Sequence, residues 1–127
     1  MPFARARLNA GTVRVAGAKM AKSAGNLVLV SELLKEHSAA AVRLLILDRR
    51  WDRDWDFSQA GLDEAAARLE RLHAAAGRPD GGGDGGTAVA AMRAALARDL
   101  DVPTALQIAE EEGGQAARSL GTLLGLW

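Results

Sequence analysis

Two lysines stand three residues apart near the start of the chain, within a run of small residues that reads GAKMAKSAGN over residues 17–26. Small neighbours let the backbone approach an anion closely, so its N–H groups can join the ammonium groups of Lys19 and Lys22 in binding that anion. Lysine on a flexible stem suits a phosphate whose charge moves during a reaction. The bare spacing also fits an exposed, solvated turn, so by itself it leaves both interpretations open.

The residues around the two lysines narrow this choice. The run KMAKS, Lys19–Ser23, resembles the Lys-Met-Ser-Lys-Ser signature of class I aminoacyl-tRNA synthetases, and Gly25-Asn26 stands where that family often has Gly-Asn. Ala21 departs from the pattern, because it replaces a serine and removes one hydroxyl, but both lysines remain. The resemblance implies a loop that closes over Mg-bound ATP as an aminoacyl-adenylate forms.

The same resemblance implies roles for individual residues of the loop. Lys22 would contact the phosphates of ATP and Lys19 would assist it. Met20, with the local backbone, would lie near the adenine, and Ser23 would belong to the same ATP-binding loop. Lys19 and Lys22 are therefore the candidate catalytic residues.

Longer stretches are similar to cysteinyl-tRNA synthetases in particular. They are NLVLVSELL over 26–34, AVRLLIL over 41–47, RWDRDWDFS over 50–58 and LARDLDVPTAL over 96–106. A related enzyme, the mycothiol-pathway cysteine ligase, shares these features and passes activated cysteine to an amino sugar instead of tRNA. The resemblance covers most of the chain and implies, as the first expectation, ATP-dependent activation of cysteine and its transfer to tRNA in the complete enzyme, with transfer to the amino sugar as the alternative.

Several features of the synthetase pattern have no counterpart in these residues. The sequence holds no His-Ile-Gly-His motif and no cysteine, so the zinc that the family holds largely through cysteines is not supported here. Asn9 stands where these families often place a histidine. We therefore expect a piece of a ligase that needs a missing N-terminal catalytic half, ending at Trp127 near where a tRNA synthetase would continue into its anticodon-binding part.

Composition sets broad limits on the protein. Apolar residues make up 49% of the chain, aromatic residues only 4%, and the formal net charge is zero, which excludes a chain that binds polyanions over its whole surface. Residues 1–30 nevertheless contain five arginines and lysines and no acid. Two interpretations of this segment stay open, a local basic surface and a few solvated arginines. No apolar run approaches the roughly 18 residues of a membrane span. We expect a cytoplasmic protein without a membrane partner.

The pattern of apolar residues predicts a mainly α fold. Residues 1–30, the expected remnant of a catalytic domain, contain glycine punctuation and a short strand over 12–15. Residues 31–76 are expected to be helical, with caps at Ser31, Ser38 and Ser58 and an ordered loop over 49–58. One face of the last of these helices carries the apolar residues Leu62, Ala65, Leu69, Leu72 and Ala76.

The second half of the chain begins after a glycine-rich segment. Residues 77–86, GRPDGGGDGG, are predicted to be a linker, since closely spaced glycines disfavour a helix. Residues 87–127 are then expected to complete an antiparallel helical bundle. Pro103 is placed in the first turn of one helix and Gly113-Gly114 at its end. The inward residues of the last helix are predicted to be Ala116, Leu120, Leu123 and Leu124.

A binding module without chemistry is the alternative of another class. Its contact cluster for tRNA or a partner protein would be the basic and aromatic residues of the segment 49–55, namely Arg49, Arg50, Trp51, Arg53 and Trp55. The structural interpretation is that the tryptophans fasten this segment to the bundle, while the arginines pair with Asp48, Asp52, Asp54 and Asp56. We prefer the structural interpretation, because interleaved acids cancel the attraction for a polyanion.

Overall fold

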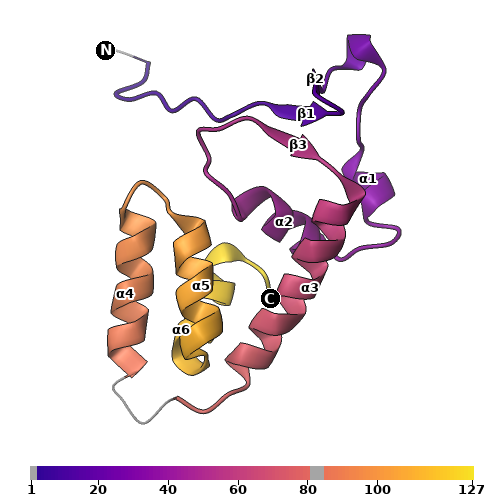
Figure 1. The fold of residues 1–127 in the computed structure, drawn as a ribbon. Coiled ribbons are helices and arrows are strands. Elements are labelled where there is room, and N and C mark those ends of the chain that lie inside the picture. The colour runs from indigo at the N-terminus through magenta and orange to yellow at the C-terminus, as the bar shows by residue number, and fades with distance from the viewer. Residues whose placement is uncertain (1–2, 81–84) are drawn as a thin grey trace.

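The computed structural model describes residues 3–80 and 85–127. An extended N-terminal segment leads into a small sheet, which lies at one end of a group of helices (Figure 1). Three short strands form the sheet in the order β2-β1-β3, and they are β1 (Val13–Val15), β2 (Ala18–Lys19) and β3 (Trp55–Phe57). β1 pairs antiparallel with β2 and parallel with β3. The strand predicted over residues 12–15 is confirmed as β1.

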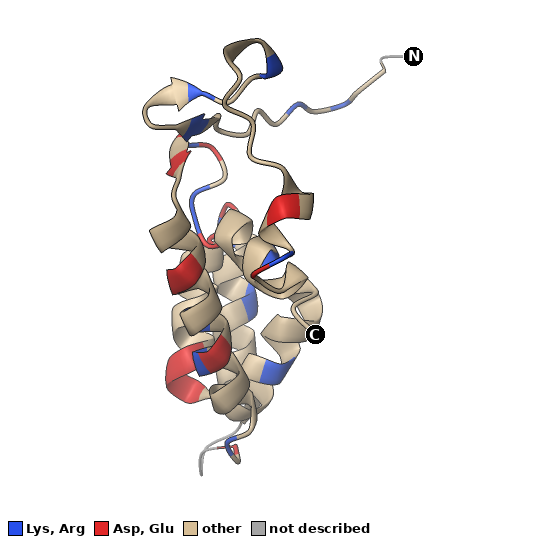
Figure 2. Ribbon diagram, turned by 90° about the vertical axis from the view of Figure 1, so that its right-hand side faces the viewer, with Lys and Arg blue, Asp and Glu red and all other residues tan. Residues whose placement is uncertain are grey.

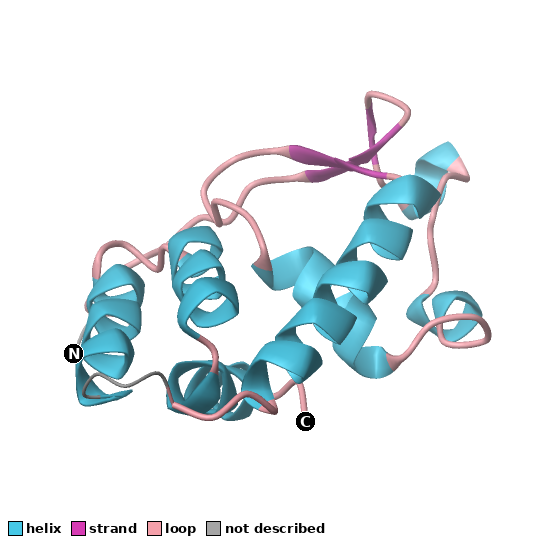
Figure 3. Ribbon diagram, turned by 60° about the horizontal axis from the view of Figure 1, so that its bottom comes forward, coloured by secondary structure: helices cyan, strands magenta, loops and turns pink. Residues whose placement is uncertain are grey.

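Helices make up most of the described residues, so the predicted mainly α fold with a short strand-bearing N-terminal part is confirmed (Figure 3). They are α1 (Val30–Leu33), α2 (Ala39–Leu47), α3 (Gln59–Ala76), α4 (Gly85–Ala97), α5 (Val102–Glu112) and α6 (Gly114–Leu124), with a short 3-10 turn η1 (Lys22–Ala24). The prediction of a loop over 49–58 is wrong in part, because its end forms β3. Trp55 and Phe57 are half-buried and Asp56 is exposed, which is the alternation of a strand.

Local capping explains where several helices begin. The Ser38 hydroxyl accepts a hydrogen bond from the Ala41 N–H at 3.1 Å, and the Ser58 hydroxyl accepts one from the Gly61 N–H at 3.0 Å, so both predicted caps are confirmed. Asp101 caps α5, whose first turn contains the proline as predicted. The cap predicted at Ser31 is wrong, because α1 begins one residue earlier, at Val30, and its first turn closes on the carbonyl of Leu29.

One hydrophobic core joins the helices. α2 packs on α3, and α3 packs on α5 and α6, which also contact α4. The predicted apolar face of α3 is confirmed at Leu62, Ala65, Leu69 and Leu72, but Ala75 is buried more deeply than Ala76. Leu123 was expected inside and is 62% exposed. The buried stripe of α6 instead consists of Ala116, Ala117, Leu120 and Gly121, spaced so that Leu123 lies beside it.

The glycine-rich segment is shorter than the predicted linker 77–86. Its residues 81–84 lie outside the described residues, and α4 begins at Gly85, so the last two glycines of the segment are helical. Gly114 likewise starts α6, although the sequence predicts only a helix end there. Within residues 3–80 and 85–127, no helix has both the length and the apolar character needed to cross a membrane.

Candidate functional site

The lysine-bearing loop starts on a tight hairpin. β1 and β2 pair Val15 with Ala18, so only Ala16 and Gly17 form the turn. Both have positive φ values, 50° and 79°, as a two-residue hairpin of the kind favoured by strand twist requires. Lys19 lies on β2 opposite Arg14, and the hairpin extends beyond the helices (Figure 1).

Two acids from the segment before and within β3 hold this hairpin. The Asp54 carboxylate accepts a hydrogen bond from the Thr12 N–H and pairs with Arg14, both at 2.8 Å. The Asp56 carboxylate accepts one from the Gly17 N–H, also at 2.8 Å. The Thr12 N–H, followed by the Arg14 guanidinium, lowers the pKa of Asp54 from its ordinary value. Asp54 and Asp56 therefore bind the hairpin. The sequence had suggested instead that they pair with the neighbouring arginines of their own segment.

Asn26 holds the lysine loop closed. Its side-chain oxygen accepts a hydrogen bond from the Ala21 N–H at 2.9 Å, and its side-chain nitrogen donates to the Lys19 carbonyl at 3.0 Å. Between these points, η1 forms one turn that ends at Gly25, whose φ is 66°. Asparagine suits this place because its amide can pair with a backbone N–H and a backbone carbonyl at once. The sequence marked Asn26 only through the Gly-Asn resemblance and assigned it no role.

The predicted ligand-binding side chains of the loop are exposed. Lys19, Lys22 and Ser23 all lie on the surface, and within residues 3–80 and 85–127 neither lysine has an ion-pair partner. Figure 2 shows basic segments on the hairpin, the loop and the N-terminal segment, with acidic segments along α3 and near the end of α5. Two ammonium groups free of carboxylates on a braced loop are available for a phosphate.

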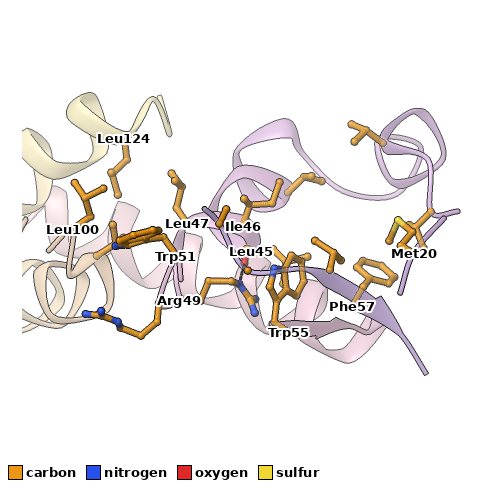
Figure 4. Close-up of a pocket in the computed structure, with 18 of the residues that line it drawn as sticks. Met20, Leu45, Ile46, Leu47, Arg49, Trp51, Trp55, Phe57, Leu100 and Leu124 are labelled. Carbon is orange, nitrogen blue, oxygen red and sulfur yellow. Dashed lines mark hydrogen bonds between the residues drawn. The ribbon is translucent and has the colours of Figure 1, made fainter. Parts of the chain in front are cut away.

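The Met20 side chain faces the apolar groove, whereas the side chains of Lys19 and Lys22 are exposed. Its N–H donates to the Val13 carbonyl at 3.0 Å, which continues the hairpin pairing past β2. The residue is half-buried and lies near Phe57 at one end of an apolar groove (Figure 4). The loop therefore presents lysines to solvent while its methionine contributes to the groove.

The groove runs from the sheet along α2 to the turn between α4 and α5. It has a volume of about 800 Å³ and is open to solvent. Its walls are almost wholly aliphatic and aromatic, with two arginines as the charged exceptions. Residues that line it include Val13 and Leu123. Among the others are Met20, Ile46, Trp51, Trp55, Phe57 and Leu100, which are labelled in Figure 4.

The two arginines that line the groove, Arg49 and Arg50, already interact with other groups of this chain. Arg49 donates to the Leu45 carbonyl at 2.8 Å, and its guanidinium lies 3.7 Å from the centre of the Trp55 ring. Burial lowers the pKa of Arg49, which the charge of Asp48 opposes. Arg50 pairs with Asp99 at 2.6 Å and with Asp52 at 3.3 Å.

Trp51 confirms the structural interpretation of the segment. Its indole N–H donates to the Asp99 carbonyl at 3.0 Å, so it fastens the segment to the turn between α4 and α5. The expected arginine partners are only partly correct. Arg50 pairs with Asp52, but Asp48 pairs with Arg68, and Asp54 and Asp56 hold the hairpin. Tertiary proximity, and not sequence adjacency, selects these pairs.

The residues present do not fit the zinc site of the resemblance. The chain has no cysteine, and within the described residues no group of three or more histidines, aspartates and glutamates is placed to hold a metal ion.

Comparison with known proteins places these features in a family. A family model described as "tRNA synthetases class I (C) catalytic domain" matches residues 1–67. The L-cysteine:1D-myo-inositol 2-amino-2-deoxy-alpha-D-glucopyranoside ligase of Thermobispora bispora is 49% identical over 107 residues, which are 84% of this chain and 26% of the relative. The enzyme of that name from Streptomyces coelicolor is 42% identical over 125 residues, or 98% of this chain and 30% of the relative.

A third enzyme of the same name, from Streptomyces griseus, is 44% identical over an alignment of 140 residues that covers 98% of this chain and 34% of the relative. The chain thus spans about a quarter to a third of the length of the curated relatives it matches. The family model covers residues 1–67 of 127, which include the hairpin, the lysine loop, β3 and the start of α3. On this match, the chain belongs to the family of class I (C) tRNA synthetase catalytic domains.

Proposed function

We propose that this chain supplies the ATP-phosphate loop and the adjoining helical bundle of an ATP-dependent cysteine ligase, whose acceptor is the amino sugar named in its relatives. The observation that carries the proposal is the lysine loop: Lys19 and Lys22 are exposed, have no carboxylate partner among the described residues, and are braced by Asn26. The ligase names of the relatives support cysteine and the amino sugar as substrates.

The chemistry assigns a clear task to the two ammonium groups. In such a ligase, a carboxylate oxygen of cysteine attacks the α-phosphorus of ATP and pyrophosphate leaves. The amine of the acceptor then attacks the activated carbonyl and AMP leaves. Negative charge grows on the departing phosphates, so Lys22, assisted by Lys19, stabilises the transition state more than the ground state. Met20 would contact the adenine from the end of the groove, and Ser23 would contribute to the same loop.

The remaining catalytic groups must come from elsewhere in the ligase. This sequence has no His-Ile-Gly-His motif and no cysteine, and the residues carrying those functions would lie in an N-terminal catalytic half. We therefore expect no cysteine-dependent exchange of pyrophosphate into ATP by the chain alone.

Transfer to tRNA is the second candidate function. The family model is named for tRNA synthetases, which favours it. Against it, Arg49, Arg50 and Trp51 of the candidate contact cluster are engaged within the chain, which leaves fewer free groups for a polyanion.

A hybrid enzyme tests the proposal directly. This chain replaces the matching segment of the Thermobispora bispora ligase, and cysteine-dependent exchange of pyrophosphate into ATP is measured. We expect activity that falls by about 100-fold or more in Lys22→Ala, which loses an interaction made with the leaving phosphates. Lys35→Ala is the matched control, because Lys35 is an exposed lysine paired with Glu32 outside the loop.

The acceptor is tested with the same hybrid. Radiolabelled cysteine is offered with the amino sugar or with tRNA, and we expect label in the sugar product alone. Transfer to tRNA would support the second candidate. Exchange that is equally fast in the Lys22→Ala and Lys35→Ala variants would overturn the role of the loop.

A further inference from the structure

The lysine loop leads into an arm, residues 27–36, that is loosely packed. Four apolar residues of this arm are about half exposed, namely Leu27, Leu29, Val30 and Leu34. α1 lies within the arm and, unlike α2 to α6, makes no extensive contact with another helix or strand of the described residues. Leu33 packs against the core. A segment with so little buried surface opens readily, so the exit of the loop depends on what fastens the far end of the arm.

His37 follows the arm and supplies a fastening to α3. Its side chain is only 14% exposed, and its Nε2 atom lies 2.8 Å from the side-chain nitrogen of Gln59 and 3.3 Å from a carboxylate oxygen of Asp63. The Gln59 nitrogen in turn donates to that same carboxylate oxygen at 3.3 Å. We call these three side chains, each in contact with the other two, the His37 clasp.

The clasp gives His37 a partner whether or not the imidazole is protonated. A neutral ring nitrogen accepts a hydrogen bond from the Gln59 amide, whereas a protonated one donates to Asp63. Within residues 3–80 and 85–127, no carboxylate other than that of Asp63 lies within 4 Å of a His37 ring nitrogen, and Glu32 of the arm pairs with Lys35. The contact is therefore suited to a permanent fastening.

Gln59 and Asp63 stand at the junction that also supports the start of the loop. Gln59 is the first residue of α3 and follows the capping residue Ser58, which comes directly after β3. β3 pairs with β1, and Asp54 and Asp56 bind the hairpin that leads into the loop. The junction of β3 and α3 thus contacts the chain on both sides of the lysine loop.

We infer that His37 is a positioning residue for the lysine loop: through the His37 clasp it fixes the exit of the loop to the junction that already fixes its entry. The inference rests on the proposed function, because it concerns the placement of ammonium groups that act on phosphates. His37 acts through Lys22 and needs no contact with the nucleotide. Placement matters because a shift of about 1 Å in a catalytic group can cost about 100-fold in rate.

The isolated chain shows whether the clasp restrains the loop. Hydrogen exchange of backbone amides is followed by NMR in His37→Ala and in the matched control His73→Ala, since His73 is the other histidine and contacts Trp127 instead. The Leu34 and Gly25 amides close the turns of α1 and η1. We expect His37→Ala to accelerate exchange of both by about fivefold, as the net loss of one hydrogen bond implies, and His73→Ala to leave them unchanged.

The hybrid ligase shows whether the clasp acts through the lysines. Cysteine-dependent exchange of pyrophosphate into ATP is measured at saturating ATP for His37→Ala, Lys22→Ala and the double variant. We expect His37→Ala to lower the rate by about fivefold or more, and to have no further effect once Lys22 is replaced. His37→Gln should recover most of the rate, because its amide can both accept from Gln59 and donate to Asp63.

Two outcomes would overturn the inference. One is an acceleration of exchange by His37→Ala that is as large within α5 as at Gly25, because it would show a general loss of stability. The other is a loss of ligase rate by the same factor with and without Lys22, which is what a merely structural role predicts. A hybrid in which Lys22→Ala has no effect would overturn the proposed function, whereas the rates at Gly25 would still decide whether the clasp holds the loop.

Discussion

At the scale of single residues, the lysine loop takes its charge from Lys19 and Lys22 and its closed backbone conformation from Asn26. Lys19 and Lys22 could be found from their spacing and from the KMAKS resemblance. Asn26 acquires its role only when the chain folds back, because its amide then bridges the Ala21 N–H and the Lys19 carbonyl. The direction of Met20, into the groove, also requires the hairpin to be in place.

Replacing Asn26 by alanine should loosen the loop and leave the helices intact. The variant loses both side-chain hydrogen bonds to the backbone, so the Ala21 amide should exchange hydrogen at least about fivefold faster, as follows from a net loss of about 1 kcal/mol or more. Exchange is measured residue by residue by NMR, with Ser23→Ala as the control within the same loop. An unchanged rate at Ala21 would show that Asn26 does not hold the loop.

The hairpin should lose one of its supports in acid. The pKa of Asp54 is lowered below its ordinary value of 3.8 by the Thr12 N–H and then by Arg14. A lowered pKa in the folded state means that the stabilisation is fully present above the ordinary value and is lost as the pH falls through the lowered one. The Thr12 amide resonance should therefore titrate below pH 3.8. Asp54→Asn should remove that step, and a Thr12 titration that persists in this variant would exclude Asp54 as its source.

At the scale of elements, the serine-capped starts of α2 and α3 could be predicted from the sequence. Ser38 and Ser58 lie directly before apolar periodic segments, and their hydroxyls accept bonds from N–H groups three residues ahead. Such contacts involve only near neighbours in the chain. β3 was missed because its short, charged sequence becomes a strand through pairing with β1, about forty residues earlier.

The cap of α3 allows a matched pair of serine variants. Ser58→Ala removes the acceptor for the Gly61 N–H and should lower the free energy of unfolding by about 1 kcal/mol. Ser31→Ala should change it by less than about 0.5 kcal/mol, because Ser31 is exposed and does not cap α1. Urea denaturation followed by circular dichroism gives both values. Equal losses in the two variants would contradict the assignment of the caps.

At the scale of the whole molecule, one arginine ties three helices together. Arg68 on α3 pairs with Asp48 at the end of α2 at 2.6 Å and with Glu110 on α5 at 2.8 Å. Its side chain is only 18% exposed. Burial by itself lowers the pKa of Arg68, but the bonds to Glu110 and Asp48 outweigh it, so the pKa is raised and the guanidinium stays charged.

Arg68→Ala should destabilise the bundle by about 2 kcal/mol, because Asp48 and Glu110 lose a shared partner at partly buried positions. Arg71→Ala is the comparison, since Arg71 also pairs with Glu110 but is 53% exposed, and it should cost less than about 1 kcal/mol. Thermal and urea unfolding measure the difference. If Arg68→Ala lowered the free energy of unfolding by less than Arg71→Ala, burial would not be what makes the Arg68 ion pairs more stabilising.

The sequence by itself determined the helical class, the two serine caps, the first strand, most of the apolar face of α3 and the position of the KMAKS run. These features depend on side-chain type and on spacing over a few residues, where physical interactions are local. Tertiary structure decided the pairing of β1 with β3, the use of Asp54 and Asp56 by the hairpin, the bridge made by Asn26, the exposure of Leu123 and the existence of the apolar groove. Each of these requires segments distant in the chain to meet, and no local pattern specifies which of several acids or apolar faces will be the partner.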